Sequence, residues 1–124
     1  MTYLATSINE SPVISEKAGA AIADVRGRAV KFDSNGAIVL CGNGDAALGV
    51  GIMTNDENVT AGMDVTVQIK DIGLVHAGAA ITKGAKLQAN ATGDLIPVAS
   101  GEPVAIALEA AAAAGAYIKA IILK

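Results

Sequence analysis

The side chains best suited to catalysis are scarce in this sequence, which contains one histidine, His76, and one cysteine, Cys41. His76 stands between Val75 and Ala77 in a strand-like stretch, and no motif assigns a nucleophile to it. Cys41 follows the apolar residues 38–40 without an activating neighbour, which is typical of a small buried hydrophobic residue. One cysteine and one histidine are also too few for a disulfide or a structural zinc site. These residues therefore predict neither a catalytic nor a metal site.

Acidic side chains are more numerous, but most of them fall in predicted turns, where polar residues are common. Residues 33–36 (Asp-Ser-Asn-Gly) are similar to part of a calcium loop. The first ligand position would be Lys31, however, and the bidentate glutamate position would be Gly42. Residues 55–58 (Asn-Asp-Glu-Asn) could hold a cation only weakly, and no glycine-rich phosphate loop occurs. We therefore expect a protein that is not an enzyme, with no catalytic residues, no metal and no cofactor.

Composition narrows the class of protein further. Ala (26) and Gly (14) make up about a third of the 124 residues, and Val and Ile (24 together) outnumber Leu (8). Because β-branched residues fit pleated sheets, and because 52% hydrophobic residues can support a core, we expect a mainly β domain rather than a helical bundle or a disordered chain. A net charge of −3, no basic stripe and three aromatic residues argue against nucleic-acid binding.

The sequence also bears on location and assembly. It shows no secretory signal at its N-terminus and no run of about 18 apolar residues that could cross a membrane, so we expect synthesis in the cytoplasm and no membrane partner. Ala and Gly bury little area per residue, so a core of this composition is marginal for a monomer at roughly 25 cal/mol per Å² of buried apolar surface. We therefore expect self-association to supply the missing burial.

Residues 1–17 form a compositional unit of their own. They combine Ser, Thr, Asn and Glu with scattered apolar residues, and they follow neither a helical nor a strand period. A proline within them favours an extended backbone. We predict an extended N-terminal arm that binds another protein, the alternative being a disordered terminus. The predicted binding residues of this arm are Tyr3, Leu4, Ile8, Pro12, Val13 and Ile14.

Residues 18–124 are expected to form a single β domain, because turn signals recur about every 8–12 residues between short apolar or alternating segments. This spacing predicts a small antiparallel β-barrel or sandwich with at most short helical turns. The clearest alternation places Val65, Val67 and Ile69 on one strand face. The expected strands span residues 20–25, 28–33, 37–41, 47–53, 64–70, 72–77, 86–90, 95–99, 103–109 and 116–123.

A turn of the form x-x-Gly-x-x-hydrophobic precedes four predicted strands, and its glycine can supply a positive φ where the chain reverses. These structural turns contain Gly19, Gly62, Gly84 and Gly115. Their separations of 43, 22 and 31 residues predict one turn used repeatedly rather than a repeat array. Residues 110–114, all alanine, are expected to form a loop or a single helical turn, and the alternative is a helix over 105–114.

Several segments follow one another in a familiar order. They are residues 48–52 (Leu-Gly-Val-Gly-Ile), 59–69, 73–77, 81–87, 93–96 and 105–111, followed by a glycine at 115. In this order the chain resembles the small capsid decoration, or cement, proteins of tailed bacteriophages, over about residues 18–124. The resemblance implies a compact β domain on the outside of the phage head, commonly a trimer at local threefold positions, with an N-terminal arm that engages the capsid lattice.

The sequence therefore predicts a structural virion protein that decorates and stabilises the outer surface of an icosahedral capsid. The resemblance implies two partners, the major capsid protein and further copies of the chain in a homotrimer that bridges capsomers. An arm of this kind could add to a sheet edge of the capsid protein, and three arms would act together through effective concentration. The alternatives are a small β-barrel that binds a ligand or glycan, and the base of a head fibre.

Overall fold

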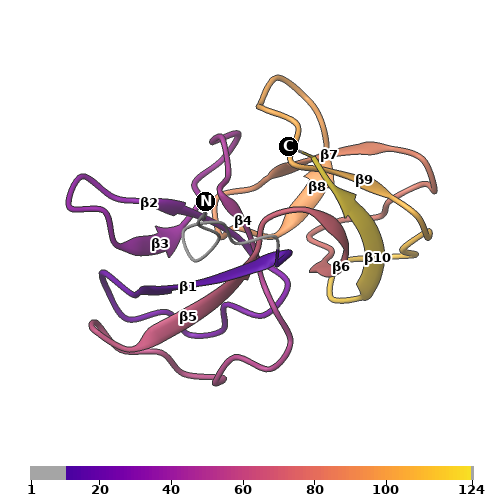
Figure 1. Ribbon diagram of the computed structural model, residues 1–124. Coiled ribbons are helices and arrows are strands. Elements are labelled where there is room, and N and C mark those ends of the chain that lie inside the picture. Colours follow the sequence, from indigo (N-terminus) through magenta and orange to yellow (C-terminus); the bar gives the residue numbers. More distant parts are fainter. Residues whose placement is uncertain (1–10, 124) are drawn as a thin grey trace, which may run out of the picture.

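The computed structural model describes residues 11–123, which form ten short strands in two five-stranded sheets (Figure 1). The first sheet has the order β1-β5-β4-β2-β3 and the second the order β6-β10-β9-β7-β8. The strands of the first sheet are β1 (Val13–Lys17), β2 (Ala29–Phe32), β3 (Ile38–Leu40), β4 (Gly49–Gly51) and β5 (Asp64–Gln68). Those of the second are β6 (Asp71–His76), β7 (Lys86–Ala89), β8 (Leu95–Pro97), β9 (Ala105–Ala107) and β10 (Tyr117–Ile122). Adjacent strands are antiparallel in both sheets.

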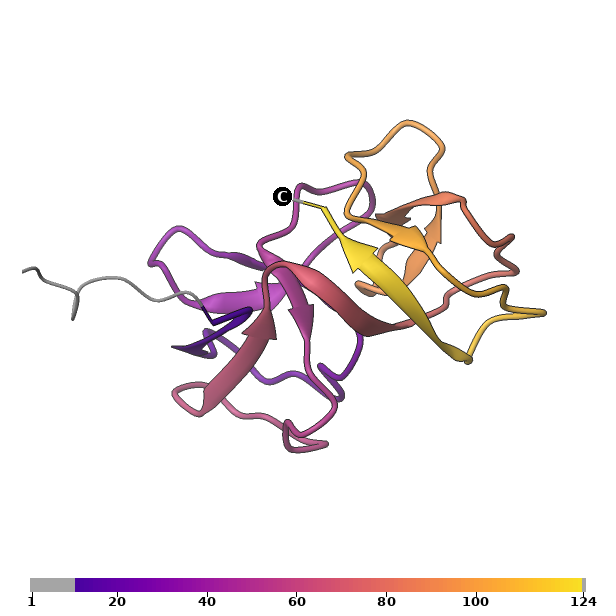
Figure 2. The same cartoon turned by 45° about the vertical axis from the view of Figure 1, so that its right-hand side comes forward.

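The predicted mainly β class is confirmed, and the architecture is sandwich-like rather than a barrel. The described residues form two separate antiparallel sheets, and neither closes on itself. Figure 2 shows the two sheets side by side, with the chain passing directly from β5 into β6. At this passage Asp71 has a φ of 66°, a left-handed conformation that Asp tolerates better than most residues. This residue begins β6, with two residues between it and the end of β5.

Most of the predicted strands are present with shorter bounds, but the strand predicted over residues 20–25 is wrong. In this segment Ile22 makes only an isolated bridge, to Val59. The apparent alternation was carried by alanines, which are too small to define a buried face. Residues 110–114 contain a bridge from Ala111 to Ile81 followed by bends and turns, so the predicted loop is confirmed and the alternative helix is absent there.

The two sheets are copies of one topology. Adding five to each strand number of the first order gives the second order. The pentapeptide Ala-Gly-Ala-Ala-Ile follows the first strand of each half, at residues 18–22 and 77–81. In both halves its first residue makes a parallel bridge and its last residue an antiparallel one. These bridges are Ala18–Ile38 and Ile22–Val59 in the first half, and Ala77–Leu95 and Ile81–Ala111 in the second.

The spacing of the glycine turns concealed this duplication. Gly62 and Gly115 occupy equivalent places, because their amides donate to the carbonyl oxygens of Ala18 and Ala77, the first residues of the two pentapeptides. The other two glycines of the motif belong to different positions of the repeated unit. The separations between successive glycines of the motif therefore joined positions that are not equivalent in the two units. The repeated pentapeptide was the signal that would have revealed the duplication.

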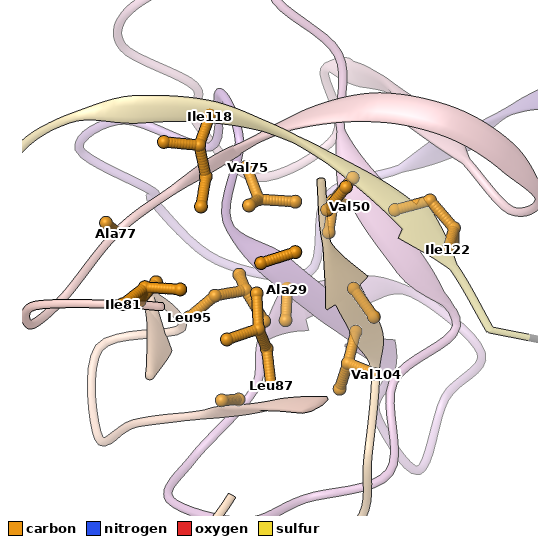
Figure 3. Packing of buried hydrophobic residues seen from close by; sticks show 14 of the residues in the cluster. Ala29, Val50, Val75, Ala77, Ile81, Leu87, Leu95, Val104, Ile118 and Ile122 are labelled. Atoms are coloured by element: carbon orange, nitrogen blue, oxygen red, sulfur yellow. The ribbon is translucent and has the colours of Figure 1, made fainter. Parts of the chain in front are cut away.

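The two halves share part of their core. The first sheet packs a cluster that includes Val30, Ile38, Val65 and Val67. The larger cluster lies in the second half, and Figure 3 shows side chains of the first sheet within it. The residues that the first half contributes to this second cluster are Ala29, Cys41 and Val50. Neighbouring positions on β2 thus face opposite cores, so the first sheet closes the core of the second half.

Close approach of strands in this region depends on residues without side chains. A Cβ atom on Gly49 would collide with the backbone oxygen of Gln68, and one on Gly51 would collide with the backbone oxygen of Val25. Both glycines belong to β4, which is fully buried between β2 and β5. Larger residues there would push neighbouring backbone segments apart.

Candidate functional site

The described part of the predicted arm is an edge strand. Val13 and Ile14 belong to β1, which pairs with β5 along its whole length, and the Ile69 amide donates to the Pro12 carbonyl at 2.8 Å. Ile14 lies opposite Val67 and packs against the first core. The structure therefore places the last five residues of the predicted arm in the first sheet. Tyr3, Leu4 and Ile8 lie outside the described residues.

Strand β1 leaves one side of the first sheet open. Among the described residues it pairs only with β5, so no described strand lies on its other side. On its outer face Ser15 and Thr66 share a hydrogen bond of 3.1 Å, and Lys17 forms an ion pair of 2.8 Å with Asp64. This edge combines an open backbone with a polar face, and it continues directly from the N-terminal segment.

The four predicted turn glycines fall into two groups. Gly62, Gly84 and Gly115 have φ values of 88°, 90° and 101°, and a Cβ atom on any of them would meet nothing within 4 Å. Their requirement for glycine is therefore conformational. Gly19 is not in this conformation, and a Cβ atom there would collide with the Asp33 carboxylate. Its small size serves packing against the β2–β3 turn rather than chain reversal.

The single histidine belongs to a polar joint between the two halves. Asp94, in the β7–β8 turn, accepts from Arg28 Nε at 2.8 Å and lies 2.7 Å from His76 Nδ1 through the same oxygen. The centroids of the His76 and Tyr117 rings lie 4.9 Å apart, with the ring planes inclined at 62°. No serine, threonine or cysteine nucleophile is hydrogen-bonded to this imidazole among the described residues. The arrangement ties the first sheet to the second.

Two further ion pairs lie on the first half. The Arg26 guanidinium donates to both carboxylate oxygens of Asp24, at 2.9 and 3.0 Å, and this pairing lowers the pKa of Asp24 and raises that of Arg26. Lys31 Nζ donates to Asp45 at 2.5 Å, which lowers the pKa of Asp45 and raises that of Lys31. These carboxylates are therefore held charged by their partners and are unsuited to act as proton donors.

The described residues also limit other kinds of site. No three His, Cys, Asp or Glu side chains gather there as a metal site, and no pocket opens on that part of the surface. Cys41 is buried, with its thiol 3.8 Å from the Ala46 carbonyl oxygen. The described part of the chain contains no helix that is long and apolar enough to span a bilayer.

Exposed apolar side chains gather on the outer face of the second sheet. Ile72 and Leu74 on β6 lie across from Ile121 and Lys119 on β10, and Tyr117 follows on the same face. Ile72 is 58% exposed, and Leu74, Tyr117 and Ile121 are each between 37% and 39% exposed. The sequence prediction missed this face. Strand β10 has apolar residues on both faces, and Lys119 was the one charged residue that could have marked the outer face.

The described residues form a small two-sheet β protein with β1 as an edge strand and an exposed apolar face on the second sheet. The family model described as phage cement protein matches residues 34–122, from the turn after β2 to the end of β10, and the chain belongs to that family. It is thus a structural protein of the phage capsid, as the sequence resemblance predicted.

A solved structure has a similar fold. It is the N base of the head fiber gp8.5 of bacteriophage phi29, with a TM-score of 0.67 and 18% sequence identity. The similarity covers 90% of this chain and 92% of that one, so both sheets are included. No curated protein matches the chain. At this level of identity the similarity establishes a shared fold, and the residue contacts above come from this chain alone.

Proposed function

We propose that the protein binds the outer surface of an assembled icosahedral head and stabilises it, as a homotrimer that bridges neighbouring capsomers through its N-terminal arms. The major capsid protein is the proposed partner. Membership of the cement family supports a role on the capsid. The observation that carries the arm proposal is that the predicted arm continues into β1, the edge strand of the first sheet.

The length of the arm suits this role. Ten residues precede the described part of the chain, and an extended chain spans about 3.3–3.6 Å per residue, so this segment can reach up to roughly 35 Å from β1. After Met1, the large apolar residues along it are Tyr3, Leu4 and Ile8. A strand added to an edge of the capsid protein would gain affinity from backbone hydrogen bonds and specificity from such side chains.

Three copies of the arm would strengthen binding without new contacts. Once one arm of a trimer is bound, the other two act at the high effective concentration set by the body that joins them. A protein that binds only the assembled lattice stabilises it by mass action, because release of the bound copies must precede disassembly. The net charge of −3 also disfavours attraction to nucleic acid.

The proposal is tested by deleting residues 2–10, which leaves β1 and its pairing with β5 intact. The truncated protein should melt within a few degrees of the full chain and should no longer co-sediment with heads that lack the native protein. Removal of residues 2–17 is a poorer test, because it also removes β1 and with it a strand of the first sheet.

A length-matched variant separates side chains from chain length. Replacing Tyr3, Leu4 and Ile8 together with serine keeps all ten residues and should weaken head binding by at least tenfold. Substituting Thr2, Thr6 and Ser7 with alanine in the same segment serves as the control and should change binding less than threefold. Unchanged co-sedimentation of the truncated protein would contradict the arm as the capsid-binding element.

A second candidate function is the base of a head fibre, which the similarity to the phi29 fiber base favours. The two functions predict different particles. A decorating protein bound to heads should appear in electron micrographs as compact knobs on the shell, whereas a fibre base should carry a filament projecting from each site.

A further inference from the structure

The internal duplication allows the outer faces of the two sheets to be compared position by position. In the first half, β1 and β5 place Val13 opposite Gln68, Ser15 opposite Thr66, and Lys17 opposite Asp64. In the second half, β6 and β10 place Ile72 opposite Ile121, Leu74 opposite Lys119, and His76 opposite Tyr117. The first face is polar and closed by its own hydrogen bond and ion pair, whereas the second is apolar and exposed.

The two outer faces also differ at β4 and β9, the third strands of the two sheets, in whether their apolar residues are covered. On the first sheet, Val50 of β4 lies on the same face as Gln68 and is buried in the core of the second half. On the second sheet, the equivalent residue is Ile106 of β9, which lies opposite Ile121 and is partly exposed. The apolar outer residue of the first unit is thus covered by the second unit, whereas the corresponding residue of the second unit is partly exposed among the described residues.

Charge restricts what can cover this face, here called the β6–β10 face and defined by Ile72, Leu74, Ile106, Tyr117, Lys119 and Ile121. Lys119 is exposed at its centre, between Tyr117 and Ile121. The nearby Glu109 carboxylate accepts from the Lys119 amide at 2.7 Å, and no salt bridge within the described residues joins the Lys119 ammonium to a carboxylate. An occupant that covers it must therefore bring a carboxylate or another acceptor.

The other half of the chain has that charge. Residues 1–69 contain four basic and eight acidic residues, whereas residues 70–124 contain five basic and four acidic residues. Among the exposed acids of the first half, Glu16, Asp56 and Glu57 form no salt bridge within the described part of the chain. Two β6–β10 faces packed on each other would instead bring two copies of Lys119 together, which is unfavourable.

We propose that the β6–β10 face is the contact surface between copies of this chain, and that it receives the acidic first half of a second copy in a head-to-tail arrangement. A contact of this type joins different surfaces of the two copies, so it closes into a ring or continues as a chain. This inference rests on the self-association included in the proposed function, for which it names the contact surface. The contact would supply the apolar burial that the composition of the chain lacks.

The test measures the mass of the full-length protein in solution by sedimentation, from about 1 to 100 μM. The wild type should be larger than one 12.3 kDa chain. The double variant Ile72→Ser/Ile121→Ser should weaken association at least tenfold, because this cross-strand pair includes Ile72, the most exposed apolar side chain of the face. The control is Phe32→Ser, whose side chain is 43% exposed on β2 of the first sheet, outside the β6–β10 face and separated from β1 by β4 and β5, and it should associate within twofold of the wild type.

A charge variant keeps the proposal testable if the serine variant fails to fold, which circular dichroism would show. Lys119→Glu retains the apolar surface and should weaken association at least tenfold, whereas Lys83→Glu, with the same charge change in the β6–β7 connection, should change it less than twofold. A monomeric wild type, or a Lys119→Glu protein that associates as tightly as the wild type, would overturn the proposal. If the wild type is monomeric and Lys119→Glu also loses head binding, the proposal is overturned. The occupant of the β6–β10 face would then be the capsid protein. Because mass in solution is measured without heads, this outcome is separate from the test of the arm.

Discussion

The Asp24 carboxylate and the Arg26 guanidinium form two parallel hydrogen bonds, a geometry that favours the charged forms of both groups. The bond from Arg26 is the main reason that the pKa of Asp24 is lowered in the folded protein. A carboxyl group whose pKa is lower in the folded state stabilises the fold above its unfolded pKa, near 3.8. That contribution is lost as the pH falls below this value and through the folded pKa.

We therefore expect the free energy of unfolding to fall as the pH is lowered below about 4, and Asp24→Asn to remove part of that fall. At pH 7 the variant should be less stable by under about 1 kcal/mol, because the pair is partly exposed. Urea unfolding between pH 3 and pH 7 measures both effects. Glu102→Gln, at an exposed carboxyl in the β8–β9 connection, is the control. An Asp24→Asn protein whose acid profile matches that of the wild type would contradict the assigned role of this pair.

At the scale of the element, the tight turns depend on backbone conformation rather than on contacts. In the turn that precedes β7, the Ala85 amide donates to the Thr82 carbonyl at 3.0 Å, and Gly84 between them has a φ of 90°. A side chain at this position would meet no neighbour within 4 Å, so the cost of replacing the glycine comes from its positive φ alone.

Gly84→Ala should therefore destabilise the protein by about 1–2 kcal/mol, and Gly84→Asn by less, because Asn tolerates left-handed backbone. Denaturant unfolding of the two variants measures the difference. The control is Lys83→Ala, one residue earlier in the same turn, which should change stability by less than about 0.5 kcal/mol. Equal effects for Ala and Asn would show that the positive φ is not the source of the cost.

The elements also show how far the sequence could be interpreted without the structure. Strand β5 was predictable because Val65 and Val67 alternate with polar residues on a half-buried strand. Strand β1 was not, since its pairing is with a strand about fifty residues later in the chain and its own pattern has no period. The β6–β10 face was hidden for a different reason. Tyr117 and Ile121 alternate with Ile118 and other apolar residues, so burial of one face depends on what packs beneath it.

For the whole molecule, the shared core implies that the two halves unfold together. Ala29, Cys41 and Val50 come from the first half and are buried among residues of the second. The joint formed by Arg28, Asp94 and His76 adds polar contacts across the same boundary. Opening one half alone would expose apolar residues of both, so the partly open state has little to stabilise it.

The cysteine offers a direct measurement of this coupling, because Cys41 is the single thiol of the chain and is 1% exposed within the shared core. Its reaction with a thiol reagent requires opening of that core. The free energy of opening obtained from labelling rates should equal the global free energy of unfolding followed by circular dichroism.

Val50→Ala, which removes two buried carbons from the same cluster, should lower both values by about 2 kcal/mol. The control is Val98→Ala, at a residue 36% exposed, which should leave both nearly unchanged. A labelling free energy well below the global value would show instead that the first half opens while the second remains folded.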